Sequence, residues 1–154
     1  MTEAAIADGT LTLEALFDND LRPIEGSNPP RYTSKLTPWA EQNWQPFFEA
    51  IKDSNPDEIT SVVCSSLKGF LPVQLKELSR APTGDIAHDT KYCRNGRIIQ
   101  DPVDLPAKAS EQDYMMAVFR HEGDGHSYKV MRNVYVPLRI NGRRWGDFEL
   151  AYSV

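Results

Sequence analysis

The stretch NVYVPLRINGRRWGDFELAY, residues 133–152, decides the fold of this chain. Apolar residues occupy every second position over 134–140 and again over 148–152. Such alternation gives a β-strand one apolar face. Asn141-Gly142, between the two runs, is the strongest two-residue signal for a β-hairpin. The stretch therefore predicts two antiparallel strands joined by a tight turn.

The residues before this stretch extend the hairpin into a meander. A run rich in apolar and aromatic residues at 114–121 is followed by EGDG at 122–125, a sequence typical of a turn. We expect three consecutive antiparallel strands over 114–121, 127–140 and 143–152.

A second group of elements is expected nearer the amino terminus. Aromatic and apolar residues recur at helical spacing over 37–54, which predicts an amphipathic helix that Pro46 kinks or divides. A β-branched run at 59–64 predicts a buried strand, and 70–73 is expected to return antiparallel to it. Prolines and glycines cut residues 74–113 into short helices and loops.

The first part of the chain is less regular. Residues 1–10 are expected to form a flexible or linker-derived terminus, either frayed or a helix that Gly9 ends. Residues 11–17 fit a short strand and a helical turn equally well. The proline-rich segment 18–34 predicts a surface loop.

These elements together predict the fold class. The order strand, strand, short helices, three strands within one mixed domain is the order of a PAS-like sensor fold. We therefore expect residues 1–154 to form a single α+β domain, PAS-like and Cache/PDC-related, with a five-stranded antiparallel sheet and flanking helices.

Composition restricts the class of partner. The chain has 17 Lys and Arg against 22 Asp and Glu residues, a net charge of −5, which disfavours nucleic acid. No run approaches the roughly 18 apolar residues of a membrane span, and the start lacks the apolar centre of a leader peptide. The two cysteines, Cys64 and Cys93, are expected to be buried thiols. We expect a cytoplasmic domain that does not contact a membrane.

Four segments carry recognisable motifs: LFDNDLRPIEGSNPPRY at 16–32, VVCSSLKGFLPV at 62–73, YCRNGRII at 92–99, and the stretch at 133–152. In this order they resemble a PAS-like sensor module of bacterial methyl-accepting chemotaxis proteins. The resemblance implies a sensory domain that binds a small molecule between sheet and helices and signals by conformational change. It also implies a homodimer and, within a longer receptor, a chemotaxis signalling module as partner.

The chain departs from the family pattern at positions that bear on the ligand. Leu67 and Lys68 stand where the family has polar residues before its turn, and Val73-Gln74 replaces a His-Asn pair. Arg144 stands where the family has a histidine. These losses motivate a second hypothesis, a ligand-free PAS-like module that dimerises or docks onto a receptor.

One group of candidate ligand-binding residues follows the expected short helices: Tyr92, Arg94, Asn95 and Arg97. Arg94 and Arg97 are three residues apart, so on a helical turn they would share a face and could clamp a carboxylate or phosphate. In the alternative interpretation they bond loop carbonyls or acids such as Asp101.

A second group lies on the expected strands: Arg120, Arg132, Tyr135 and Trp145. Small-molecule pockets combine apolar walls with a few polar groups, which these residues would supply on the concave face of the sheet. Alternation does not tell which face is concave, and ordinary packing is the alternative for each residue.

Histidines give the only sequence support for a metal or cofactor. His88 has Asp85 three residues before it and Asp89 beside it, and His121 and His126 flank the expected turn. A zinc site needs three or four converging ligands, so we expect no metal and no cofactor. A haem or flavin redox or gas sensor is kept as a third hypothesis.

Enzyme motifs are absent from the sequence. It contains no nucleophile elbow, zinc-protease helix, P-loop or dinucleotide fingerprint. A set such as Ser79, Asp85 and His88 has generic spacing. We therefore expect a protein that is not an enzyme.

Overall fold

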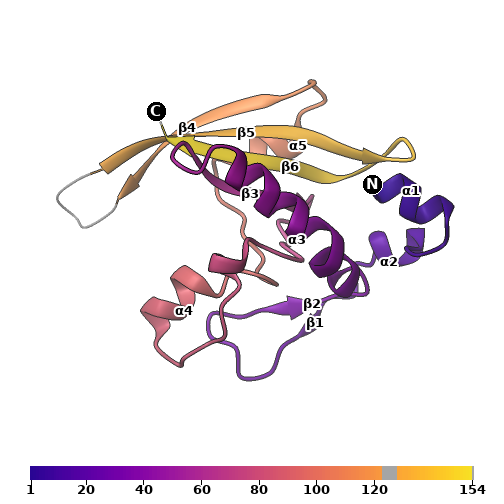
Figure 1. The fold of residues 1–154 in the computed structure, drawn as a ribbon, viewed down its shortest axis with the longest axis horizontal. Helices are drawn as coiled ribbons and strands as arrows, with labels where there is room; N and C mark the ends of the chain where they lie inside the picture. Colours follow the sequence, from indigo (N-terminus) through magenta and orange to yellow (C-terminus); the bar gives the residue numbers. More distant parts are fainter. Residues whose placement is uncertain (123–127, 154) are drawn as a thin grey trace.

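A four-stranded antiparallel sheet runs along one side of the fold, the upper side in Figure 1. The computed structural model describes residues 1–122 and 128–153. Its main strands are β3 (Ile59–Ser66), β4 (Met115–Glu122), β5 (Tyr128–Ile140) and β6 (Arg143–Ser153). Their order across the sheet is β3-β6-β5-β4, so β3 pairs with the last strand of the chain. The α+β class and the meander are confirmed, while the turn expected at 122–125 lies largely outside the described residues.

The hairpin between β5 and β6 follows from its two turn residues. Asn141 and Gly142 both have positive φ, 50° and 77°, as the tight turn favoured by twisted strands requires. Val136 pairs with Phe148, which places the alternating apolar residues of both strands on one face. The alternation in the sequence thus predicted this face correctly.

The fifth strand expected over 70–73 does not form. Phe70 accepts a turn hydrogen bond from Ser66 and then makes an isolated bridge with Ile98. Leu71 exchanges backbone hydrogen bonds with the 96–97 segment, and Pro72 has no N–H to offer a neighbouring strand. The segment is buried but lies against the loop that follows α4, so the main sheet has four strands.

A separate two-stranded sheet stands within the proline-rich segment. It consists of β1 (Arg22–Pro23) and β2 (Tyr32–Thr33), paired antiparallel. Pro23 cannot donate a backbone hydrogen bond, but β1 is so short that the proline breaks no extended ladder of strand hydrogen bonds. The loop expected at 18–34 is therefore ordered around one small hairpin.

The helices are α1 (Thr2–Ala7), α2 (Leu13–Leu16), α3 (Thr37–Ser54), η1 (Lys76–Leu78, a 3-10 turn), α4 (Ile86–Tyr92) and α5 (Leu105–Ala109). Residues 2–7 adopt the helical alternative for the terminus, and Thr2 accepts a hydrogen bond from the buried Trp44 indole at 3.1 Å. Pro46 lies inside α3 without dividing it. None of the described helices combines the length and apolar character that crossing a bilayer requires.

The apolar core lies between α3 and the face of the sheet formed by alternate residues of β3, β5 and β6. Trp44 and Phe48 from α3 are buried there, and Trp44 meets Trp145 edge to face at 5.1 Å between ring centres. Phe48 packs against Phe148 from β6. Burial of such aromatic side chains is the main source of stability in a domain of this size.

Candidate functional site

The opposite face of the sheet carries a buried set of polar side chains under α5. Residues 147 and 149 alternate with Phe148 on β6, so they point away from α3. Register places Tyr135 opposite Glu149 and Ser65 opposite Asp147. We name this set the polar cluster; its members are Ser65, Asp104, Lys108, Asn133, Tyr135, Arg144, Asp147 and Glu149.

Lys108, from α5, occupies the middle of the polar cluster. Its ammonium lies 3.4 Å from an Asp147 oxygen and 3.5 Å from a Glu149 oxygen, and it donates to the Ser65 hydroxyl. Only 7% of the side chain is exposed. Buried ions in proteins are paired in this way because an isolated one is strongly disfavoured.

Arg144 joins β6 to the carboxyl end of α5. Its guanidinium lies 2.6 Å from Asp147 and donates to the backbone carbonyls of Ser110, at 2.8 Å, and Ala107, at 3.3 Å. Asp147 is therefore held between two cations, those of Arg144 and Lys108, in a position with no solvent exposure.

Three further bonds complete the polar cluster, one of them from Asn133 Nδ2 to Glu149 at 3.4 Å. The Tyr135 hydroxyl donates to Asp104, the residue before α5, at 2.6 Å, and burial together with this bond raises the pKa of the phenol. Ser65 donates to Glu149. Burial also raises the pKa of Glu149, against the opposing effects of Ser65 and Lys108. Of the three carboxyl groups in the polar cluster, Asp147 and Glu149 thus contact its two cations, and Asp104 bonds to Tyr135.

The structure separates the predicted sheet residues. Tyr135 belongs to the polar cluster, but Trp145 lies in the apolar core, where its indole donates to the Leu16 carbonyl at 2.8 Å. Trp145 also borders a small cleft of about 180 Å³. Arg132 is an odd number of positions from Tyr135 on β5, so its side chain lies on the face of the sheet opposite the polar cluster. The side chain of Arg120 falls outside the described residues.

Tyr92 ends α4, which lies apart from α5 (Figure 1), and the other predicted residues, Arg94, Asn95 and Arg97, lie in the segment that follows α4. The Arg80 guanidinium stacks over Tyr92, with its central carbon 4.1 Å from the centre of the tyrosine ring. Arg97 donates to the Thr90 carbonyl at 3.2 Å. Arg94 Nε and Asn95 Oδ1 are buried and have no hydrogen-bond partner among the described residues. The bond from Arg97 to a carbonyl matches the alternative interpretation of this arginine, and the role of the group in ligand binding stays a prediction.

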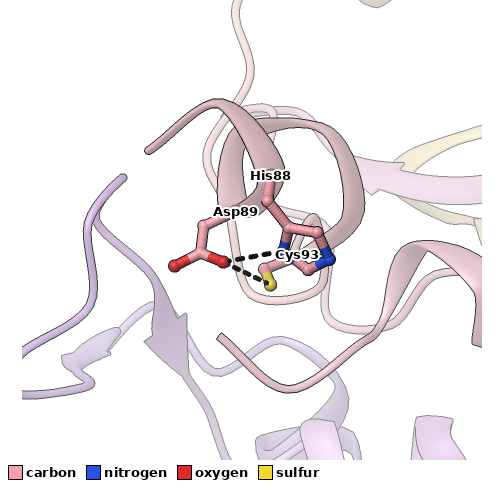
Figure 2. Close-up of side chains that lie close together, drawn as sticks. All are labelled: His88, Asp89 and Cys93. Carbon is pink, nitrogen blue, oxygen red and sulfur yellow. Dashed lines mark hydrogen bonds and ion pairs between the residues drawn. The ribbon is translucent and has the colours of Figure 1, made fainter. Parts of the chain in front are cut away.

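His88 and Asp89 of α4 come together with Cys93, the residue that follows the helix (Figure 2). One ligand atom from each lies within 4.8 Å of the others. His88 Nδ1 is 3.0 Å from Asp89 Oδ1, and the Cys93 thiol donates to the same oxygen. Asp85, part of the predicted histidine group, instead caps α4 through the His88 N–H.

The hydrogen bonds around this trio indicate that it holds the loop before α4 in place rather than binding a metal. Asp89 also accepts hydrogen bonds from the Thr83 and Gly84 N–H groups, so its carboxylate is already fully engaged. The bonds from His88 and Thr83 lower its pKa, whereas burial raises the pKa of the Cys93 thiol. Zinc would require the thiolate and a fourth ligand.

Of the polar cluster, sequence reasoning predicted only Tyr135 as a site residue and missed Ser65, Asp104, Lys108, Asn133, Arg144, Asp147 and Glu149. The available signal was two acids, Asp147 and Glu149, which alternate with apolar residues in the last predicted strand. Cys93 was missed in the trio at α4, although it is four residues after Asp89 and so on the same helical face.

Comparison with known proteins adds no relative. No family model, no curated protein and no solved structure matches this chain. The function therefore has to be inferred from the residues of the candidate sites.

Proposed function

We propose that this chain is a non-enzymatic sensory domain that binds a small molecule between its sheet and α5 and signals by moving α5. The resemblance of four segments to chemotaxis-receptor sensor modules supports the proposal. The structure also keeps part of the expected element order, one strand, short helices and then three strands, although residues 70–73 add no second strand. Within a longer receptor, the movement would pass to a chemotaxis signalling module.

The observation that carries the proposal is the way α5 is attached. A helix of five residues has no stability of its own. Polar bonds hold it at both ends: Asp104 to Tyr135 before the helix, and Arg144 to the last carbonyls. Lys108 adds its ammonium between them.

Polar bonds of this kind can be exchanged for bonds to a ligand. A small molecule that offers its own donors to Asp147 or Glu149 would compete with Lys108 and favour a displaced α5. Differential affinity for the two positions of α5 is the requirement for signalling by population shift.

A thermal-shift screen tests the proposal. Amino acids, carboxylates, amines and nucleobases are added singly to wild type, Tyr135→Phe and Tyr152→Phe. At least one class is expected to raise the Tm of wild type, and Tyr135→Phe to reduce that rise, because it removes the bond to Asp104. Tyr152→Phe is the control, because Tyr152 lies on β6 on the face of the sheet opposite Tyr135. Absence of any response in wild type contradicts the proposal.

A specific observation favours one alternative, a docking or dimerisation module. Four apolar side chains of β4 and β5 are exposed to solvent on the face of the sheet that also carries Phe148. They are Met116 at 48%, Val118 at 62%, Val130 at 39% and Val136 at 39% exposed. Contiguous apolar surface of this kind marks interaction sites. Light scattering tests the dimerisation form of this alternative, and a monodisperse monomer at high micromolar concentration contradicts that form.

The haem or flavin hypothesis stays a prediction. His88, its principal support, has its Nδ1 engaged with Asp89. An absorption spectrum of the purified protein tests the hypothesis, since either cofactor colours the sample.

A further inference from the structure

Four arginines gather around the loop at 92–97: Arg31, Arg80, Arg94 and Arg97. Arg31 Nε donates to the Asn95 carbonyl at 2.9 Å, and Arg80 stacks on Tyr92. Arg97 returns to the end of α4 through the Thr90 carbonyl. We name this group the arginine loop.

The arginine loop lacks an anionic partner within the part of the chain that the structure describes. Within 4.0 Å, none of its four guanidinium groups forms an ion pair with a described residue. Elsewhere Arg139 pairs with Glu111, and Arg144 with Asp147. Since acidic residues outnumber basic ones in this chain, the lack of partners here does not reflect a shortage of carboxylates.

Buried polar atoms inside the loop also lack partners. Arg94 Nε, a donor, and Asn95 Oδ1, an acceptor, are both inaccessible and unbonded within the described part of the chain. Folded proteins satisfy nearly all such atoms, so each exception requires an explanation. Of the two, only the Arg94 Nε donor can bond to an anion, because the oxygens of an anion accept hydrogen bonds. Burial, with Arg97 nearby, lowers the pKa of the Arg94 guanidinium, while the attraction of Asp101 opposes this effect only in part. An additional negative charge at this place would stabilise the guanidinium.

We propose that the arginine loop is an anion-binding site, separate from the polar cluster, in which Arg94 and Arg97 hold the carboxylate or phosphate group of a small molecule. The guanidinium fork suits both groups, since each offers two oxygens to parallel N–H donors. Arg97 uses one nitrogen for Thr90, and an arginine has five N–H donors in all. Tyr92 and Asn95 flank the two arginines.

Calorimetric titration of the full chain with sodium malonate and with sodium phosphate, each at constant ionic strength adjusted with chloride, tests the site. At least one of the two anions is expected to bind wild type. Arg94→Gln and Arg97→Gln are each expected to weaken binding by about ten-fold or more, because each removes a charged hydrogen bond. Arg139→Gln, which removes an exposed arginine paired with Glu111, is the control and should bind like wild type. Binding of malonate alone indicates a carboxylate ligand, and binding of phosphate alone a phosphorylated one.

Thermal unfolding in chloride separates this role from a structural one. If Arg94 serves an absent anion, Arg94→Gln should keep or raise the Tm in chloride, because a buried charge without a partner has been removed. A large fall in Tm would show that Arg94 is structural and would overturn the proposal. So would binding of neither anion to wild type, or equal weakening by Arg94→Gln and Arg139→Gln. None of these outcomes bears on the polar cluster, which the Tyr135→Phe screen tests independently.

Discussion

The Lys108 ammonium on α5 lies 3.4 Å from a carboxylate oxygen of Asp147 on β6, and both side chains are withdrawn from solvent. The contact connects a five-residue helix outside the sheet with a fully buried charge inside the domain. The position of α5 and the charge balance of the polar cluster therefore depend on each other. Each of them should respond when the other is changed.

Replacing Lys108 with methionine should destabilise the domain. Lys108→Met keeps the length of the side chain but leaves Asp147 with Arg144 alone and removes the cation that faces Glu149. Breaking a buried pair from one side costs about 3 kcal/mol, which urea denaturation would measure. Lys76→Met, at an exposed lysine on η1, should stay within about 0.5 kcal/mol of wild type. An unchanged midpoint for Lys108→Met would contradict the structural account of α5.

Glu149 should give the stability of the domain a characteristic pH dependence. Burial raises its pKa above the ordinary 4.5, so the folded protein binds this proton more tightly than the unfolded chain does. Stability contributed by the protonated form is then lost as the pH rises from about 4.5 through the higher folded pKa. Glu149→Gln cannot titrate and should lack this fall, so its stability relative to wild type should improve with rising pH.

Denaturation at a series of pH values checks the prediction for Glu149. Glu41→Gln, at an exposed position on α3, is the matched control and should follow wild type throughout. Parallel curves for Glu149→Gln and wild type would show that Glu149 ionises as an ordinary surface group.

Asp89 should act in the opposite direction. Hydrogen bonds from His88 and Thr83 lower its pKa below the ordinary 3.8, so its ionised form stabilises the fold above that pH. This stabilisation is lost as the pH falls from about 3.8 through the lower folded pKa. Asp89→Asn should reduce the Tm at neutral pH, and the difference should narrow on acidification. Circular dichroism melts would show this, with Asp53→Asn on α3 as control; a difference that stays constant with pH would refute the role of the charge.

The pairing of β3 with β6 can be tested at Gly146. A Cβ at this position would lie 1.9 Å from the Ser65 carbonyl oxygen, a backbone atom that cannot withdraw without moving β3. Gly146→Ala is therefore expected to cost about 3 kcal/mol. Gly142→Ala meets no neighbour and should cost only about 1 kcal/mol for its positive φ. Similar losses for the two variants in chemical denaturation would contradict the register of β3 against β6.

Local patterns in the sequence predicted the parts of the fold that local interactions determine. The hairpin at Asn141-Gly142 follows from the backbone preferences of two residues, and α3 follows from its apolar spacing. The strand expected over 70–73 failed because its partner depends on distant residues: Leu71 bonds to the 96–97 segment, which no local pattern could indicate.

The candidate sites were predicted in part for the same reason. Arg94 and Arg97 share a short motif, so their proximity was evident from sequence. Tyr135 was selected by strand parity, but its partner Asp104 is 31 residues away, and parity does not distinguish a solvent-facing acid from one buried beneath a helix. Lys108 gave no signal at all, since its role arises only when α5 covers the sheet.

Native mass spectrometry tests the central claim, binding of a small molecule by this domain, most directly. Freshly purified chain and the same chain mixed with pooled amino acids, carboxylates, amines and nucleobases are measured under conditions that preserve the fold. We predict an adduct of one small molecule on the chain in at least one sample. The bare mass of the chain in both samples, with charge states of a folded protein, would contradict the claim.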